Sequence, residues 1–350
     1  MRFSTMIRAV LAGAALFIGP TGEIRGETRA GARHWMQIVP GLTAIETAED
    51  GAPVLIGKTG NRLRVTIRNG AVELQPVSAL VHSALPPGAL PDAVVNQRET
   101  GQGTLSAWLD QPTTRYGHAV LGDGIEAGGL SIKYADGIEQ TLTLPASRVF
   151  EDRFVRFTDD LHEGRPVLMT VTSYLDAGAA LTLVDPGAPG GPGPSVLAEA
   201  AAIGIANRWL NPVGAADVDG DGRIEFLAVV TPHIGGALTA YEHLGDRLVV
   251  KYSLDGFSNH AYGSRELGLS AVADLDAPGD GIAEVIVPDA RRNAMTVVRL
   301  AGGTPRIVAS ITAGTRIVHR LVVHDLDGDG VPELTFGTEG GGLVIWAPGL

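Results

Sequence analysis

The chain contains no cysteine, few aromatic residues and no apolar run of membrane-spanning length. Without disulfides, an exported protein must draw its stability from an apolar core, from bound metal ions or from both. A membrane-spanning helix needs about 20 consecutive apolar residues, and the sequence offers no such stretch. No basic stripe is present, which argues against a nucleic-acid partner.

The N-terminus has the pattern of a secretory signal. Arg2 and Arg8 bracket a short charged region, an apolar stretch runs from Ala9 to Gly19, and polar sequence follows. We therefore expect residues 1–30 to be a signal peptide and residues 31–350 to form a single domain in the periplasm or outside the cell. The cleavage site stays open, and a buried first strand or helix is the alternative interpretation.

Three acidic segments interrupt otherwise apolar sequence: DVDGDGRIE from Asp217, DLDAPGDGIAE from Asp274 and DLDGDGVPEL from Asp325. In the first and third, acids occupy loop positions 1, 3, 5 and 9, and glycines occupy positions 4 and 6. The middle segment has two extra residues after its second Asp. The net charge is −12, and the three segments carry as many carboxylates, so the acidity says little about partners.

Crowded carboxylates repel one another, by about 1 kcal/mol for a pair ~4 Å apart in water, unless a cation lies among them. Alternate side chains and one backbone carbonyl would converge on one point, as Ca²⁺ requires. An exposed Asp-Gly turn is the alternative. An EF-hand is excluded, because its Glu at position 12 is replaced by Ala228 and Phe336 and because the flanks indicate strands. The predicted Ca²⁺ ligands are Asp217, Asp219, Asp221, Arg223 (carbonyl) and Glu225; Asp274, Asp276, Asp280 and Glu284; and Asp325, Asp327, Asp329, Val331 (carbonyl) and Glu333.

The acidic segments recur with a period of 50 to 60 residues, and about four strands fit into each period. This pattern predicts an all-β fold, a β-propeller of four-stranded blades. We expect six blades, with seven as the alternative. Five lie at about 42–80, 102–146, 150–202, 213–256 and 269–312. The sixth runs from Leu321 to Trp346, and the N-terminal strand His34 to Pro40 would complete it and close the propeller.

The segments from Asp217 and Asp325 resemble the FG-GAP/VCBS repeats of integrin-α-like β-propellers found in exported bacterial proteins. This resemblance implies that each cation-binding loop joins the first and second strands of its blade. It also implies the metal-ligand roles given above. The inserted Pro278-Gly279 departs from the family pattern in the middle loop. Because such propellers include adhesion, binding and enzyme-associated proteins, the resemblance implies a scaffold and leaves the function open.

Arg208, Arg265 and Arg316 each precede the first Asp of an acidic segment by nine residues. In a propeller this position lies at the end of the blade opposite the metal loop. With Trp209, His260 and Tyr262 nearby, the three arginines predict a face that binds an anionic ligand, a glycan or a protein. Structural pairing of each arginine within the blades is the alternative.

Two functions follow from these observations. The first is a non-catalytic, calcium-stabilised binding or interaction scaffold of the cell envelope. The second is an enzyme acting on an anionic polysaccharide, a lyase for example, with His260 or Tyr262 as the base. The sequence identifies neither the ligand nor the oligomeric state.

Overall fold

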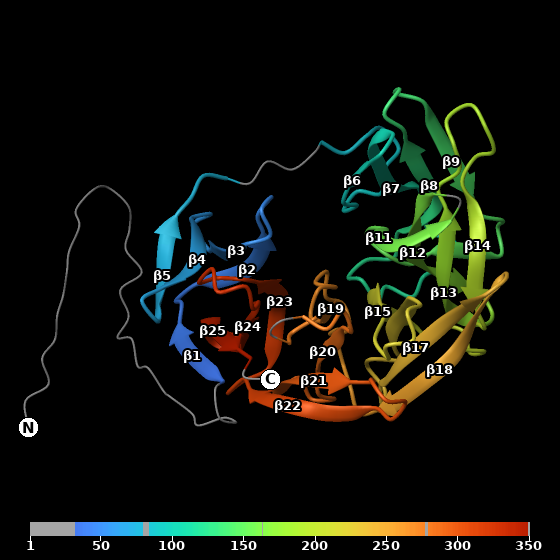
Figure 1. The fold of residues 1–350 in the computed structure, drawn as a ribbon. Coiled ribbons are helices and arrows are strands. Elements are labelled where there is room, and N and C mark those ends of the chain that lie inside the picture. The colour runs from blue at the N-terminus through green and yellow to red at the C-terminus, as the bar shows by residue number, and fades with distance from the viewer. Residues whose placement is uncertain (1–31, 80–83, 163, 277–278, 349–350) are drawn as a thin grey trace, which may run out of the picture.

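A computed structural model describes residues 32–79, 84–162, 164–276 and 279–348. The predicted signal peptide lies outside these residues. The described chain is almost entirely β-structure, with one short 3₁₀ turn, η1 (Glu339–Gly341). Three of its sheets have four strands each, and residues 96–255 form one continuous 13-stranded sheet that divides into three further groups of four main strands, so that six blades surround a centre (Figure 1). The first strand of each blade lies nearest the centre and the fourth lies outermost, as expected for a propeller.

Blades 1 to 3 follow the chain in order. Blade 1 comprises β2 (Leu42–Thr47), β3 (Pro53–Gly57), β4 (Arg62–Arg68) and β5 (Ala71–Pro76). Blade 2 comprises β6 (Asn96–Thr100), β7 (Gly103–Thr113), β8 (Glu126–Lys133) and β9 (Glu139–Thr143). Blade 3 comprises β11 (Arg156–His162), β12 (Arg165–Tyr174), β13 (Gly178–Asp185) and β14 (Ser195–Ala200), and the short β10 (Arg148–Phe150) pairs with β12.

Blades 4 to 6 contain the three acidic loops. Blade 4 comprises β15 (Leu210–Ala216), β16 (Glu225–Val230), β17 (Ala237–Leu244) and β18 (Arg247–Asp255). Blade 5 comprises β19 (Ala271–Ala273), β20 (Glu284–Pro288), β21 (Ala294–Arg299) and β22 (Arg306–Thr312). Blade 6 comprises β23 (Ile317–His324), β24 (Glu333–Thr338), β25 (Gly342–Ala347) and β1 (Arg33–Ile38).

The N-terminal strand completes blade 6, which confirms the sequence prediction. β1 runs antiparallel to β25 from the pair Arg33–Ala347 to the pair Ile38–Gly342. β25 therefore has a strand partner on both sides, and the two ends of the described chain are held in one sheet.

Burial follows strand position within a blade. The second strands, such as β16 and β24, are buried along nearly their whole length, because neighbouring blades cover both of their faces. Their sequences are accordingly continuous apolar runs, as in FLAVV from Phe226. The fourth strands, such as β5, alternate between exposed and partly buried residues, as expected for half-solvated strands.

Five apolar clusters fill five of the six interfaces between blades. They join blades 2 and 3, 3 and 4, 4 and 5, 5 and 6, and 6 and 1. In the described part of the chain, no such cluster joins blade 1 to blade 2. The blade 1 face away from blade 6 instead carries the polar residues of β4, among them Arg64, which pairs with Asp50 at 2.6 Å. The corresponding face of blade 2 carries Ser131, which hydrogen-bonds Asp110 and Thr141.

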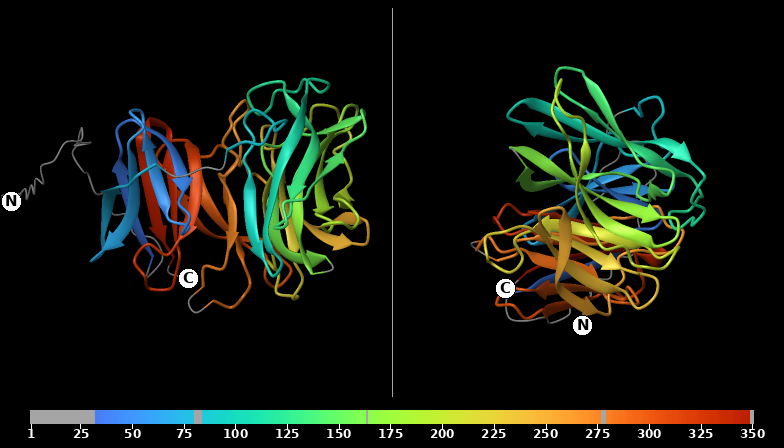
Figure 2. Two further views of the ribbon diagram at one scale, coloured as in Figure 1. Left: turned by 90° about the horizontal axis from the view of Figure 1, so that it is seen from above. Right: turned by 90° about the vertical axis from the view of Figure 1, so that its right-hand side faces the viewer.

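The strands run between two ends of each blade, and the hairpins lie at these two ends (Figure 2). In blade 4, β15 leads into the acidic loop at one end. At the other end Leu210 pairs with Val230, next to the β16–β17 hairpin. The acidic loops of blades 4, 5 and 6 thus join first to second strands, and the segments before β15, β19 and β23 lie at the opposite end.

Candidate metal loops and the opposite end of the blades

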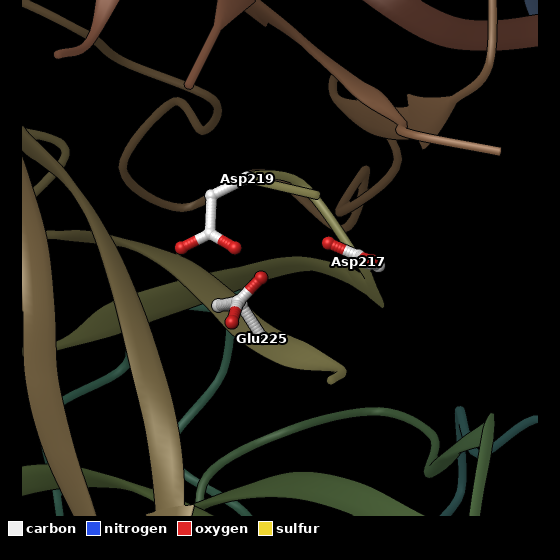
Figure 3. Close-up of side chains that lie close together, drawn as sticks. All are labelled: Asp217, Asp219 and Glu225. Carbon is white, nitrogen blue, oxygen red and sulfur yellow. The ribbon is translucent and has the colours of Figure 1, made fainter. Parts of the chain in front are cut away.

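The acidic loop of blade 4 is shaped by hydrogen bonds from its own backbone. Asp217 accepts the N–H groups of Gly220 at 2.7 Å and of Gly222 at 2.8 Å. Glu225 is fully buried at the start of β16 and accepts the Val218 N–H at 3.1 Å. Gly220 and Gly222 both have positive φ, near 85° and 81°, which glycine adopts without steric cost. The loop thus folds back over Glu225 (Figure 3).

The loop of blade 6 repeats this arrangement. Asp325 accepts the N–H groups of Gly328 at 2.7 Å and of Gly330 at 2.9 Å, and buried Glu333 accepts the Leu326 N–H at 2.7 Å. In both loops one oxygen from each of positions 1, 3 and 9 lies within 4.8 Å of the other two. These two sets are Asp217, Asp219 and Glu225, and Asp325, Asp327 and Glu333.

Position 7 contributes its N–H to the loop in both cases. Arg223 N–H donates to Asp221 and Val331 N–H donates to Asp329, each at 2.9 Å. The predicted role of the Arg223 and Val331 carbonyls as metal ligands stays a prediction.

The loop of blade 5 keeps the framework despite its two extra residues. Asp274 accepts the N–H of Gly281 at 2.8 Å, and Glu284 accepts the N–H of Leu275 at 3.0 Å. Asp280 accepts the Ile282 N–H at 2.9 Å. Among the residues described, however, three carboxylates do not converge here as they do in the other two loops.

Each loop also has a basic side chain among its carboxylates, which the sequence patterns did not reveal. In blade 4, Lys251 Nζ lies 2.6 Å from Asp219, 2.8 Å from Asp221 and 2.9 Å from Glu225. Burial lowers the pKa of Lys251, but the three carboxylates outweigh burial and raise it overall. Hydrogen bonds from Lys251 and then from Arg223 hold the pKa of Asp221 well below its usual range.

Arginines take this place in the other two loops. In blade 5, Arg299 Nη2 lies 2.8 Å from Asp276 and 2.5 Å from Glu284. In blade 6, Arg33 Nη2 lies 2.9 Å from Asp327 but 3.5 Å from Asp329 and 3.7 Å from Glu333.

The donor set of the blade 6 loop fits a hard divalent cation. The converging atoms are carboxylate oxygens, which Ca²⁺ prefers. Burial raises the pKa of Glu333 to about 7, and the neighbouring charges of Asp327 and Asp329 also raise it. A bound cation would favour the ionised form of all three carboxylates.

The three arginines of the predicted binding face lie at the blade ends opposite the loops, and each has a different partner. Arg265 is exposed and pairs with Asp123 of the β7–β8 connection at 2.8 Å. Arg316 is exposed and pairs with Glu339 of its own blade at 3.2 Å. Arg208 is partly buried, and its Nη1 donates to the Asn207 carbonyl at 3.5 Å. Their role in ligand binding stays a prediction.

Trp209 and His260 lie beneath this end of the blades. Trp209 Nε1 donates to the Glu151 carbonyl at 2.9 Å. His260 Nε2 donates to the Ser264 carbonyl at 2.9 Å, so its Nδ1 must accept the hydrogen bond from His233 Nε2, also at 2.9 Å. Burial lowers the pKa of His233 to about 4 and that of His260 to about 3. Both imidazoles are therefore neutral structural groups at physiological pH.

A histidine and a buried carboxylate meet beside this cluster. His118 Nδ1 lies 2.7 Å from Glu151, which is fully buried and also accepts a hydrogen bond from Ser173 at 2.5 Å. Tyr262 is 61% exposed, and its hydroxyl donates to the His118 carbonyl at 2.8 Å. No sequence motif marks His118, because its partner Glu151 lies outside blade 2, in the segment that leads into blade 3.

No family model matches the chain, and no curated protein matches it. Among solved structures, it is similar to BBS1N from a complex with ARL6DN, with 10% identity, a TM-score of 0.49 and coverage of 90% of this chain and 96% of that chain. It is also similar to the WD40 domain of Toxoplasma gondii coronin, with 14% identity, a TM-score of 0.43 and coverage of 91% and 86%.

A further similar structure is the soluble aldose sugar dehydrogenase of Escherichia coli, with 10% identity, a TM-score of 0.42 and coverage of 90% of this chain and 99% of that chain. Identity at this level says nothing about what this chain binds. Separately, none of the described helices has the length and apolarity to cross a membrane.

Proposed function

We propose that the protein is an exported, calcium-stabilised β-propeller of the FG-GAP/VCBS type that acts as a non-catalytic binding scaffold in the periplasm or outside the cell. The observation that carries this proposal is the matched geometry of the loops that begin at Asp217 and Asp325. In both, backbone N–H groups hydrogen-bond the carboxylates at positions 1, 3 and 9, and one oxygen of each carboxylate lies within 4.8 Å of the other two. Such a framework suits a cation that stabilises the blade.

Calcium is tested by thermal unfolding of the mature protein. A ligand that binds only the folded state stabilises it by RT ln(1 + [L]/Kd), about 2.7 kcal/mol at a hundredfold excess over Kd. We expect the Tm to fall when chelator replaces calcium, and Asp327→Ala to lose most of the calcium response. Asp159→Ala is the control, because Asp159 is an exposed residue of β11 that pairs with Arg98, away from the acidic loops. Identical melting curves in calcium and in chelator would refute calcium binding.

For the ligand, we propose an anionic glycan or an acidic protein surface at the blade ends opposite the loops. Arg265 and Arg316 are exposed there, as is Tyr262, and charge-assisted hydrogen bonds are worth about 1.5–3 kcal/mol each. The test is a screen against anionic glycans with calcium present. Arg316→Ala should weaken binding roughly tenfold or more without lowering the Tm, whereas Arg306→Ala, an exposed arginine at the loop end, should not.

A second candidate function is acid–base catalysis on an anionic polysaccharide. His260 is fully buried and bonded at both nitrogens, so it is poorly placed to take a substrate proton. His118 is better placed, because Glu151 orients its ring and its side chain keeps 10% exposure. If uronate-containing glycans are cleaved, His118→Gln should abolish cleavage while His243→Gln does not. Cleavage that survives His118→Gln would exclude this base.

A further inference from the structure

Three basic side chains from three different strands meet equivalent carboxylates in the three loops. Lys251 belongs to the fourth strand of blade 4, Arg299 to the third strand of blade 5, and Arg33 to the N-terminal strand of blade 6. Each contacts the acids at positions 3 and 9 of its loop, and Lys251 and Arg33 also reach position 5. The same oxygens would face a metal ion.

A β-bulge directs Lys251 to this point. Ala240 pairs with Tyr252 and Tyr241 pairs with Val250, so Lys251 is the extra residue of β18. Consecutive strand residues normally point to opposite faces, and a bulge can re-aim one of them. Here Lys251 and Tyr252 both reach Asp219, with the Tyr252 hydroxyl donating to the same oxygen at 2.9 Å. The ammonium is thus built into the loop by the backbone.

The three loops bind their basic side chains with different numbers of short contacts. Lys251 makes three contacts of 2.9 Å or less, and its side chain is only 18% exposed. Arg299 makes two contacts of 2.8 Å or less at 23% exposure. Arg33 makes one contact of 2.9 Å and two longer ones, and its side chain is 44% exposed at the start of β1. Displacing a solvated arginine that makes one short contact costs little free energy.

We propose that these side chains are resident counter-cations and decide which loop accepts calcium. Lys251 and Arg299 occupy the cation position of blades 4 and 5, so these blades fold without metal. The loop of blade 6 is the one that exchanges its tethered cation, Arg33, for Ca²⁺. The assignment of calcium to blade 6 rests on the proposed function, whereas the role of Lys251 does not.

Lys251→Met tests the proposal, because methionine keeps the length and apolar contacts of the stem and removes the charge. In chelator, Asp219 and Glu225 then lose the ammonium that neutralises them, Asp221 keeps only its pairing with Arg223, and the Tm should fall by several degrees. Calcium should restore it. By titration calorimetry, the wild-type protein should bind one Ca²⁺ per chain and Lys251→Met should bind two. Lys133→Met is the control, since Lys133 is half exposed and pairs with Glu139 on the surface.

Arg33→Met completes the test. It should still bind one Ca²⁺, with a Kd several-fold lower than that of the wild type, because no tethered charge competes. A stoichiometry of two Ca²⁺ per wild-type chain would contradict the assignment of calcium to the loop of blade 6 alone. An unchanged Tm of Lys251→Met in chelator, with no added calcium site, would overturn the counter-cation role. If the wild type binds no calcium but Lys251→Met still melts lower in chelator, the proposed calcium function fails and the role of Lys251 stands.

Discussion

Glu126 offers a sharp test of the electrostatics at the start of β8. Its side chain is 1% exposed, and neither carboxylate oxygen has a hydrogen-bond partner among the described residues. Burial raises the pKa of Glu126 to about 10, and the nearby charges of Glu151 and Asp123 add to this effect. The carboxyl group is therefore neutral in the folded protein at pH 7 and ionised in the unfolded chain.

The sign of the effect follows from proton linkage. The folded-state pKa of about 10 lies above the ordinary value of 4.5, so the folded state binds more protons between these values and loses stability as pH rises. Each pKa unit corresponds to about 1.4 kcal/mol, so by pH 7 the loss reaches at most about 3 kcal/mol. Glutamine has nearly the same shape and no charge, so Glu126→Gln removes this loss.

The assay is urea unfolding of Glu126→Gln and of the wild type at pH 5 and pH 8. We expect the variant to be more stable by about 1–3 kcal/mol at pH 8, with a much smaller difference at pH 5. Glu139→Gln serves as the control in the same blade, because Glu139 is half exposed and should change little at either pH. A Glu126→Gln variant that is less stable than the wild type at pH 8 would show that the carboxylate is ionised and paired.

Three further outcomes are expected. Phe336→Ala, in the fully buried second strand of blade 6, should lower the free energy of unfolding by about 3–5 kcal/mol in urea titrations. Removing residues 32–38 should leave β25 unpaired, abolish cooperative unfolding and speed proteolysis of blade 6. Stability should decrease as pH falls from about 6.5 towards 4, because His233 and His260 are neutral in the folded protein and become protonated in the unfolded chain. His260→Asn should reduce this pH dependence by up to about 1.4 kcal/mol per pH unit, as measured by thermal unfolding over a series of pH values.

Much of the fold could be predicted because it depends on local, repeated signals. The acidic loops set the period, and the apolar second strands carry a strong signal of their own. The start of blade 2 was placed too late, because β6 reads NQRET from Asn96 and has no apolar residue to mark it. The contact of Lys251 with its loop could not be predicted, because it depends on a bulge about 30 residues away from the carboxylates that it meets. The pairing of His118 with Glu151 likewise exists only once blades 2 and 3 are packed.

The polar faces that blades 1 and 2 turn toward each other favour six blades over seven. A further blade between blades 1 and 2 would have to cover Arg64 on one side and the Ser131–Asp110 pair on the other, and these groups are already paired with each other or with solvent-facing partners. Burying these polar groups against an apolar sheet would cost more free energy in desolvation than the new apolar contacts would contribute. Polar outer faces are also what terminal repeats need in order to stay soluble. Blade 2 is held instead by its apolar interface with blade 3 and by two ion pairs at 2.8 Å, Arg153 with Asp92 and Arg265 with Asp123. Closure of the chain therefore depends on β1 in blade 6, and among the described residues no apolar core joins the facing sides of blades 1 and 2.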